Sequence, residues 1–242
     1  LENLPPNLYL MIATRADPPL PLARLRGRRE LVELRVVELR FTFEETATLL
    51  NGEMDIDLSS EDIATLLSRT EGWIAGIQMA ALSMQGREDT SAFIETFVGT
   101  HRYILDYLAQ EVLQRQREDI QTFLLQTAIL DSLNGSLCEA VTGWAEASCL
   151  LEVLDQANLF IIPLDDDRKW YRYHHLFADL LRHRLHQTHA DQVPILHRRA
   201  SDWYENNGFV AKAIDHALSA RDFERAADLI VGNNVLAHVP NL

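Results

Sequence analysis

Residues 159–173 have the sequence Leu-Phe-Ile-Ile-Pro-Leu-Asp-Asp-Asp-Arg-Lys-Trp-Tyr-Arg-Tyr, which is two apolar runs separated by an acidic turn. Two such runs around a turn are typical of a β-hairpin. Upstream, residues 118–130, 135–143 and 147–157 carry apolar residues at helical spacing and predict three short helices. Three helices followed by a hairpin is the element order of a winged helix. We therefore predict a winged-helix domain over residues 118–190.

The chain after the hairpin is expected to be helical. Residues 174–186 predict one more helix, and the segments 194–206, 210–220 and 223–231 predict a series of helices separated by short breaks. Small alanine side chains in these segments permit close helix packing. The pattern resembles one unit of a helical repeat array. We assign residues 191–242 to the start of such an arm.

The segment before the winged helix is also expected to be helical. Ser59 or Ser60 supplies an N-cap, followed by acidic residues in the first turn, and Gly72 ends that helix. Further helices are predicted over the ranges 43–50, 74–84, 90–98 and 102–116. We assign residues 41–117 to a helical domain, so the fold class is mostly α.

The N-terminal residues have a different pattern. Residues 8–13, Leu-Tyr-Leu-Met-Ile-Ala, form a short continuous apolar run that ends before a Pro-rich stretch, and this predicts a buried strand of a parallel sheet. Residues 32–39 predict a second strand or an extended segment. Because a lone buried strand is not stable, we expect its neighbours to precede Leu1, which is not an initiator Met. Residues 1–40 are thus assigned to the remnant of an α/β domain.

Composition and charge exclude several classes of function. Of the 242 residues, 47% are apolar and 24% charged, which is ordinary for a globular chain, and no apolar run is long enough for a membrane helix. The net charge of −14 argues against nucleic-acid binding over the whole surface. Basic residues concentrate in the ranges 15–40 and 168–199, which suggests a local anion site. With only Cys138 and Cys149, we expect no disulfide framework and a cytoplasmic location.

Catalytic motifs are absent from the sequence. The lysines, Lys169 and Lys212, lie outside any Gly-rich phosphate loop, and there is neither a Gly-x-Ser-x-Gly elbow nor a zinc motif. His183 and His186 share a predicted helix face, but their Arg-rich surroundings repel a cation, so no metal site is predicted. Arg15 follows the strand at 8–13, where open α/β sheets bind ligands. Its guanidinium could contact a terminal phosphate or cap the loop.

Several strings, in order, resemble one known family. The chain is similar to the nucleotide-binding oligomerisation region of MalT-like (maltose-regulon activator type), LuxR-family, ATP-dependent transcriptional regulators, which are signal-transduction ATPases of the STAND class. The resemblance covers nearly all of the chain. It rests on the strings at residues 12–26, 39–46, 70–78, 107–113 and 163–181.

The resemblance implies roles for four residues. Arg15 matches the sensor arginine that reads the γ-phosphate. Gly72 and Trp73 match a Gly-x-Pro position whose backbone packs on the adenine, although Ile74 stands where the family has Pro. His174 matches the Met-His-Asp histidine that reaches the β-phosphate of ADP, with His175 in place of the Asp. No catalytic or metal-binding residue carries over.

The function implied by the resemblance is a nucleotide-sensing and oligomerisation switch. ATP or ADP is the expected cofactor of the whole regulator, which would be a slow ATPase. The present chain, without a phosphate loop, is expected neither to hold a cofactor nor to act as an enzyme. Expected partners are a second copy, and in the whole protein a small-molecule inducer or regulatory protein. No membrane contact is expected.

Two alternatives come from other classes. The first is a winged-helix DNA-binding module, but the helix at 147–157 carries Glu152 and Asp155, and the turn carries the acidic run at 165–167. Phosphate would repel both, so we expect no direct nucleic-acid binding. The second is a protein-interaction scaffold built on the helices after residue 190.

Overall fold

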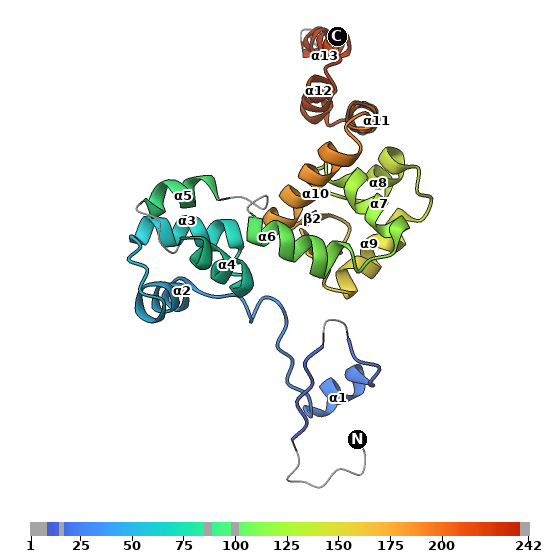
Figure 1. The fold of residues 1–242 in the computed structure, drawn as a ribbon. Helices are drawn as coiled ribbons and strands as arrows, with labels where there is room; N and C mark the ends of the chain where they lie inside the picture. Colours follow the sequence, from blue (N-terminus) through green and yellow to red (C-terminus); the bar gives the residue numbers. More distant parts are fainter. Residues whose placement is uncertain (1–8, 15–16, 85–88, 98–101, 238–242) are drawn as a thin grey trace.

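The computed structural model describes residues 9–14, 17–84, 89–97 and 102–237, and in this part of the chain helices dominate (Figure 1). One short antiparallel hairpin is the only sheet among these residues. The predicted mostly-α class is therefore confirmed. Within these ranges, no helix combines the length and the apolar character needed to cross a membrane.

The N-terminal region contradicts the predicted strand. Residues 9–14 form no strand, and Tyr9 and Met11 are 96% and 94% exposed. A parallel strand needs neighbours for its backbone hydrogen bonds, and the described residues offer none beside it. Residues 31–35 have no regular secondary structure and no strand partner, and a turn follows at 36–39. Between residues 9–14 and 31–35 lies α1 (Leu22–Arg28), a helix that the sequence pattern missed and that buries no residue.

The helical domain starts with a well-capped helix. Thr42 and Glu45 form a reciprocal capping box at α2 (Phe43–Ala47), which continues into the π-helical segment η1 (Thr48–Glu53). Ser59 caps α3 (Ser60–Thr70) by accepting a hydrogen bond from the Asp62 N–H, as predicted. The domain continues with α4 (Ile74–Met84), α5 (Thr90–Thr96) and α6 (Arg102–Tyr107), and η2 (Leu108–Leu113) leads from it to the winged helix.

The winged-helix elements follow in the predicted order. They are α7 (Glu118–Thr127), α8 (Gly135–Thr142), α9 (Ala147–Gln156), β1 (Ile161–Pro163), β2 (Tyr171–Tyr173) and α10 (His175–Thr188). The strands pair with Ile161 opposite Tyr173, and Leu133 adds a backbone bridge to Tyr171. The buried Tyr173 hydroxyl lies 2.7 Å from the Thr127 hydroxyl, which ties the hairpin to α7.

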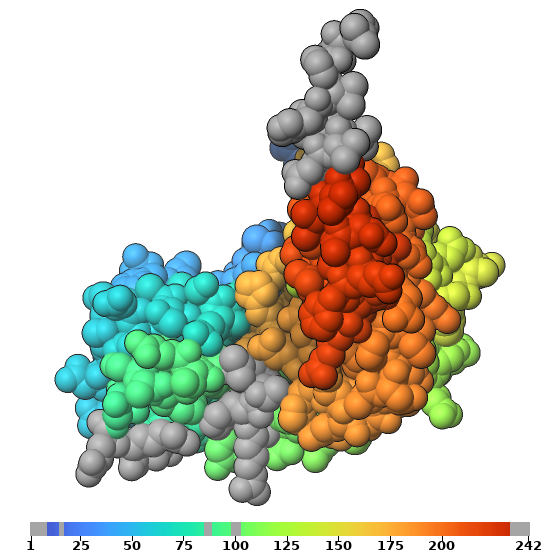
Figure 2. All heavy atoms as spheres, turned by 90° about the horizontal axis from the view of Figure 1, so that it is seen from above, coloured from blue at the N-terminus to red at the C-terminus, as the bar shows by residue number. Residues whose placement is uncertain are grey.

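The arm consists of α11 (Val193–Asn206), α12 (Val210–Ser219) and α13 (Phe223–Ala237). Ala213 and Ala217 are fully buried, so α11 and α12 approach closely, and the Ser201 hydroxyl donates a 2.8 Å hydrogen bond to the Ala213 carbonyl. Figure 2 shows α13, in red, lying along the orange helices of the arm.

The helical domain and the winged helix meet where α3 packs on α10, and η2, which leads from one to the other, also contacts α10. This contact brings the turn between α3 and α4 next to the junction between β2 and α10. Both segments were singled out by the sequence, and they are separated by 104 positions at the hydrogen bond that joins them.

Candidate functional site

The predicted site residues lie on two segments that the fold brings together. Gly72 and Trp73 occupy the turn from α3 to α4, and His174 is the residue before α10. The rings of Trp73 and His174 are 6.0 Å apart between centroids. Arg15 lies outside the described residues, so its place relative to this cluster is not described.

His174 is buried, with 5% of its surface exposed. Its Nε2 lies 2.9 Å from the Thr70 carbonyl, which can only accept, so Nε2 carries the proton and donates. Nδ1 is buried and has no hydrogen-bond partner. Burial lowers the pKa of His174, and the facing Glu71 carboxylate and Thr70 carbonyl only partly offset this. The ring is therefore neutral at pH 7, and Nδ1 presents a lone pair.

Gly72 is required by the local backbone. Its φ is +73°, and a Cβ there would lie 2.8 Å from the Phe41 carbonyl oxygen and 2.9 Å from the Arg40 Cβ. The Phe41 N–H donates a 2.8 Å hydrogen bond to the Gly72 carbonyl. This glycine thus lets the segment before α2 lie directly on the α3–α4 turn, which is a structural reason for its presence beside the predicted adenine contact.

Trp73 packs among aromatic rings. The Phe160 ring packs edge-on against it with ring centroids 5.1 Å apart, and the Tyr107 ring is tilted against it with ring centroids 5.7 Å apart. A Cβ at Gly76, one turn along α4, would lie 2.8 Å from the Trp73 ring. The indole is only partly buried, so one part of it packs the interface between the domains while another part remains accessible.

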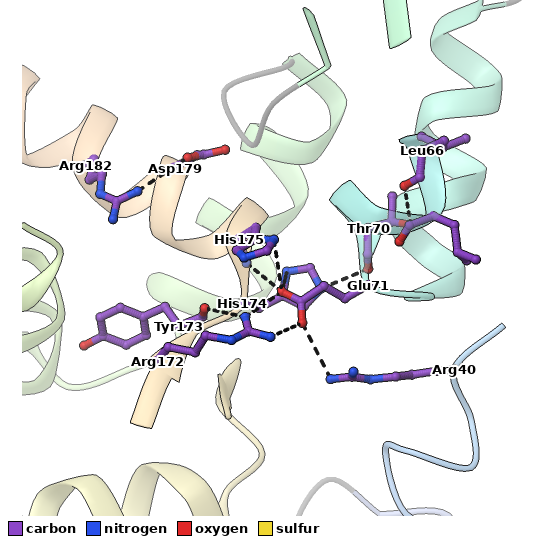
Figure 3. Close-up of polar contacts among 11 residues, drawn as sticks. Arg40, Leu66, Thr70, Glu71, Arg172, Tyr173, His174, His175, Asp179 and Arg182 are labelled. Carbon is purple, nitrogen blue, oxygen red and sulfur yellow. Dashed lines mark hydrogen bonds and ion pairs between the residues drawn. The ribbon is translucent and has the colours of Figure 1, made fainter. Parts of the chain in front are cut away.

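Glu71 is the residue that sequence reasoning missed. Arg172 holds its carboxylate with two hydrogen bonds of 2.8 Å, and the His175 backbone N–H donates a third of 3.0 Å (Figure 3). Arg40 forms a longer ion pair of 3.7 Å. The helix dipole disfavours a carboxylate at the C-terminal end of a helix, and Glu71 is the C-cap of α3. An acid just before Gly72 was therefore a signal in the sequence that a cationic side chain would lie near it.

The electrostatics of Glu71 follow from these contacts. Burial by itself raises the pKa of the Glu71 carboxyl, but the hydrogen bonds and charge of Arg172 and the hydrogen bond from the His175 N–H outweigh burial and lower the pKa to about 2. The carboxylate is therefore charged at neutral pH. Its side chain is 7% exposed, while that of Arg172 is 25% exposed. The pair joins the helical domain to the winged helix.

The histidines of α10 do not assemble a metal centre. Within the described ranges, no three His, Cys, Asp or Glu side chains are placed to hold a metal ion. His183 and His186 share a helix, as the sequence suggested, but no carboxylate completes a ligand set around them.

Comparison with known proteins adds the family. Residues 109–193 match the family model described as the MalT winged helix domain. Residues 109–193 form a MalT-type winged-helix domain. The predicted resemblance to MalT-like regulators is thereby confirmed, and the relatives named below show that it covers nearly the whole chain.

Three relatives show the extent of the match. The chain is 35% identical over 230 residues, 95% of its length, to the serine/threonine-protein kinase PknK of Mycobacterium tuberculosis, of which this covers 21%. It is 34% identical over 233 residues to the HTH-type transcriptional regulator MalT of Serratia proteamaculans, and 32% identical over 235 residues to that of Klebsiella pneumoniae. Each of these two matches covers 96% of the chain and 26% of the regulator.

The MalT-like chain thus spans about a fifth to a quarter of the length of the curated relatives it matches. These relatives are named as transcriptional regulators and as a kinase.

Proposed function

We propose that the MalT-like chain is the nucleotide-sensing and oligomerisation segment of an ATP-dependent, LuxR-family transcriptional activator of the STAND class, acting in the cytoplasm. The observation that carries the proposal is the meeting of Gly72, Trp73 and His174, which come from two segments and lie together at the contact between α3 and α10. A ligand that touched all three residues would report on the packing of the helical domain against the winged helix.

The residues present fit a nucleotide phosphate. The orphaned Nδ1 of His174 is a buried polar atom that lacks a partner, and Arg172 and Arg40 add two guanidinium groups within reach of the same spot. Guanidinium groups match phosphate oxygens well. His174 would have to bind a proton at Nδ1 in order to donate to a phosphate, because Nε2 is already donating to Thr70. When bound, ADP or ATP would supply the phosphate charge that these groups bind.

The chain itself is not proposed as an enzyme. Phosphoryl transfer needs a cradle of backbone amides and a bound Mg²⁺, and the sequence contains no phosphate loop. In a longer MalT-like protein that supplies such a loop, we propose slow ATP turnover coupled to the switch. A small-molecule inducer or a regulatory protein would bias that switch there.

Direct DNA binding is disfavoured by the charges on the wing. Asp165 accepts hydrogen bonds from two backbone N–H groups of the turn, and the nearby cations are already paired: Lys169 with Asp167, and Arg168 with Asp155 of α9. Fluorescence anisotropy with random and promoter-like duplexes tests this reading. Sub-micromolar, sequence-selective binding would favour the DNA-binding alternative instead.

The function is tested in a full-length MalT-like protein that contains this chain. His174→Ala is expected to speed ADP dissociation, because one charge-assisted hydrogen bond of about 1.5–3 kcal/mol is lost. His186→Ala, an exposed histidine on the same helix, is the matched control and is expected to behave as wild type. Equal ADP dissociation rates in wild type and His174→Ala would remove His174 from the proposed site.

A further inference from the structure

The groups around Glu71 form an anion-binding cluster, which we define as the side chains of Arg40, Arg172 and His174 and the backbone N–H of His175. They come from the segment before α2, from β2 and from the start of α10 (Figure 3). The 14-residue helix α10 adds the positive end of its dipole. Two guanidinium groups and a helix N-terminus therefore face a single carboxylate.

Glu71 does not satisfy every member of the cluster. Its Oε1 accepts from Arg172 and from the His175 N–H, and its Oε2 accepts from Arg172. Arg40 remains 3.7 Å away, and His174 Nδ1, buried and without a partner, is 4.0 Å from Oε1. A planar carboxylate offers two oxygens, whereas a terminal phosphate group offers three in a tetrahedral arrangement. Arg40, and His174 Nδ1 once it binds a proton, thus give the cluster more capacity for an oxyanion than the carboxylate uses.

The cluster is open to solvent on one side. The His175 and Arg40 side chains are 61% and 33% exposed, while the Glu71 carboxylate lies beneath them at 7%. A small anion can therefore approach Arg40 and His175 from solvent. It can reach His174 Nδ1 only if the Glu71 carboxylate moves away.

We propose that Glu71 is a built-in competitor of phosphate at this cluster. The carboxylate and a phosphate group exclude one another, because both take the Arg172 guanidinium and the His175 N–H. With the carboxylate in place, Glu71 and Arg172 join the α3–α4 turn to β2. Phosphate binding exchanges this interdomain ion pair for a ligand and so loosens the helical domain from the winged helix. The inference rests on the proposed function only for the source of the phosphate, a nucleotide.

The test compares Glu71→Gln with wild type in the whole 242-residue chain. Isothermal titration with inorganic pyrophosphate at low ionic strength is expected to show binding tighter by about tenfold or more in Glu71→Gln, the scale of one charge-assisted hydrogen bond. Glu53→Gln, which removes an exposed acid from η1, keeps the wild-type affinity. In the Glu71→Gln background, Arg172→Gln abolishes the gain. Equal affinity in Glu71→Gln and wild type, or an equal gain in Glu53→Gln, overturns the proposal.

A measurement on wild type covers the case in which Glu71→Gln fails to fold. Carboxyl and imidazole NMR signals of Glu71 and His174 are followed while pyrophosphate is added. The two signals are expected to change together, because the carboxylate leaves as the phosphate arrives. A change at His174 with no change at Glu71 refutes competition.

The same titrations with ADP separate this inference from the proposed function. A gain for both pyrophosphate and ADP in Glu71→Gln supports competition at a nucleotide site. A gain for pyrophosphate alone supports the competitor and argues against the nucleotide as its source. No gain for either ligand refutes the competitor, whatever the ADP dissociation rates in the longer protein.

Discussion

The arm contains a pair of histidines whose titration is expected to control its stability. His197 of α11 and His216 of α12 face each other with their Nδ1 atoms 2.9 Å apart, so one nitrogen donates and the other accepts. The carboxylate of Asp131 and three basic groups surround the pair, namely Lys212, Arg182 and His186. The hydrogen bond survives one added proton, but a second proton would place two N–H groups against each other.

The magnitude follows from the pKa values. Burial lowers the pKa of both His197 and His216, from 6.5 to about 4 in each. The unfolded chain therefore binds more protons than the folded chain between pH 6.5 and 4, and stability is fully present above pH 6.5 and is lost as the pH falls. One such histidine makes the free energy of unfolding about 2 kcal/mol lower at pH 5 than at pH 7.5. We expect about this value for the pair, because His197 is partly exposed and solvent screens its share.

Urea unfolding at pH 5 and pH 7.5 measures the effect, with the double variant His197→Gln, His216→Gln as the comparison. Glutamine can donate and accept but does not titrate, so the variant should lose the pH dependence that the pair contributes. His189→Gln, an exposed position just after α10, should keep it. Glu71 does not interfere, since its pKa of about 2 places its own loss of stability below this window. An unchanged pH dependence in the double variant would refute the reasoning.

Three further predictions address the turn, the chemistry and the ends of the chain. Gly72→Ala should lower the free energy of unfolding in urea by about 1–3 kcal/mol, because the added Cβ meets the Phe41 carbonyl at a φ of +73°. Gly143 has a φ of +78°, and a Cβ there would have no atom within 4 Å, so Gly143→Ala introduces the backbone strain without the clash. It should lower the free energy of unfolding by less than Gly72→Ala does. An equal loss in both variants would show that the close approach at Gly72 is unimportant. The chain alone should release no phosphate from ATP above background in a steady-state assay, and release that Arg15→Ala abolishes would contradict this. The exposed apolar side chains of residues 9–14 and 32–39 should promote self-association, measured by light scattering on the chain and on a version that starts at Leu39; a monomer in both at high micromolar concentration would exclude it.

Local sequence determined the helices from residue 43 onward. Ser59 and Asn134 are N-caps with side chains that accept from the backbone of the next turn, and Gly143 and Gly208 adopt positive φ at helix ends. These signals act within a few residues, so they are readable without knowing the fold. The order of helices and hairpin was sufficient to predict the winged helix, which the family match confirms.

The N-terminal prediction was wrong because a strand is not a local structure. The apolar run at 8–13 has the composition of a buried strand, yet its pairing depends on other strands, and the described residues provide none. The helix α1 was missed for a related reason. Its Arg-rich sequence spans only seven residues, too few to show a helical apolar period, and the helix buries no residue.

The sequence by itself determined which residues were candidates, because Arg15, Gly72, Trp73 and His174 match motif positions of the family that the chain resembles. Only the tertiary structure decided what surrounds them. Glu71 meets Arg172 across 101 positions of chain, and the Thr70 carbonyl fixes the tautomer of His174. Such contacts depend on how α3 packs against α10, and that packing is set by many small apolar contacts spread over both domains. No spacing within either segment encodes it, because the free energy that holds the two charges together arises only when burial brings them into one place.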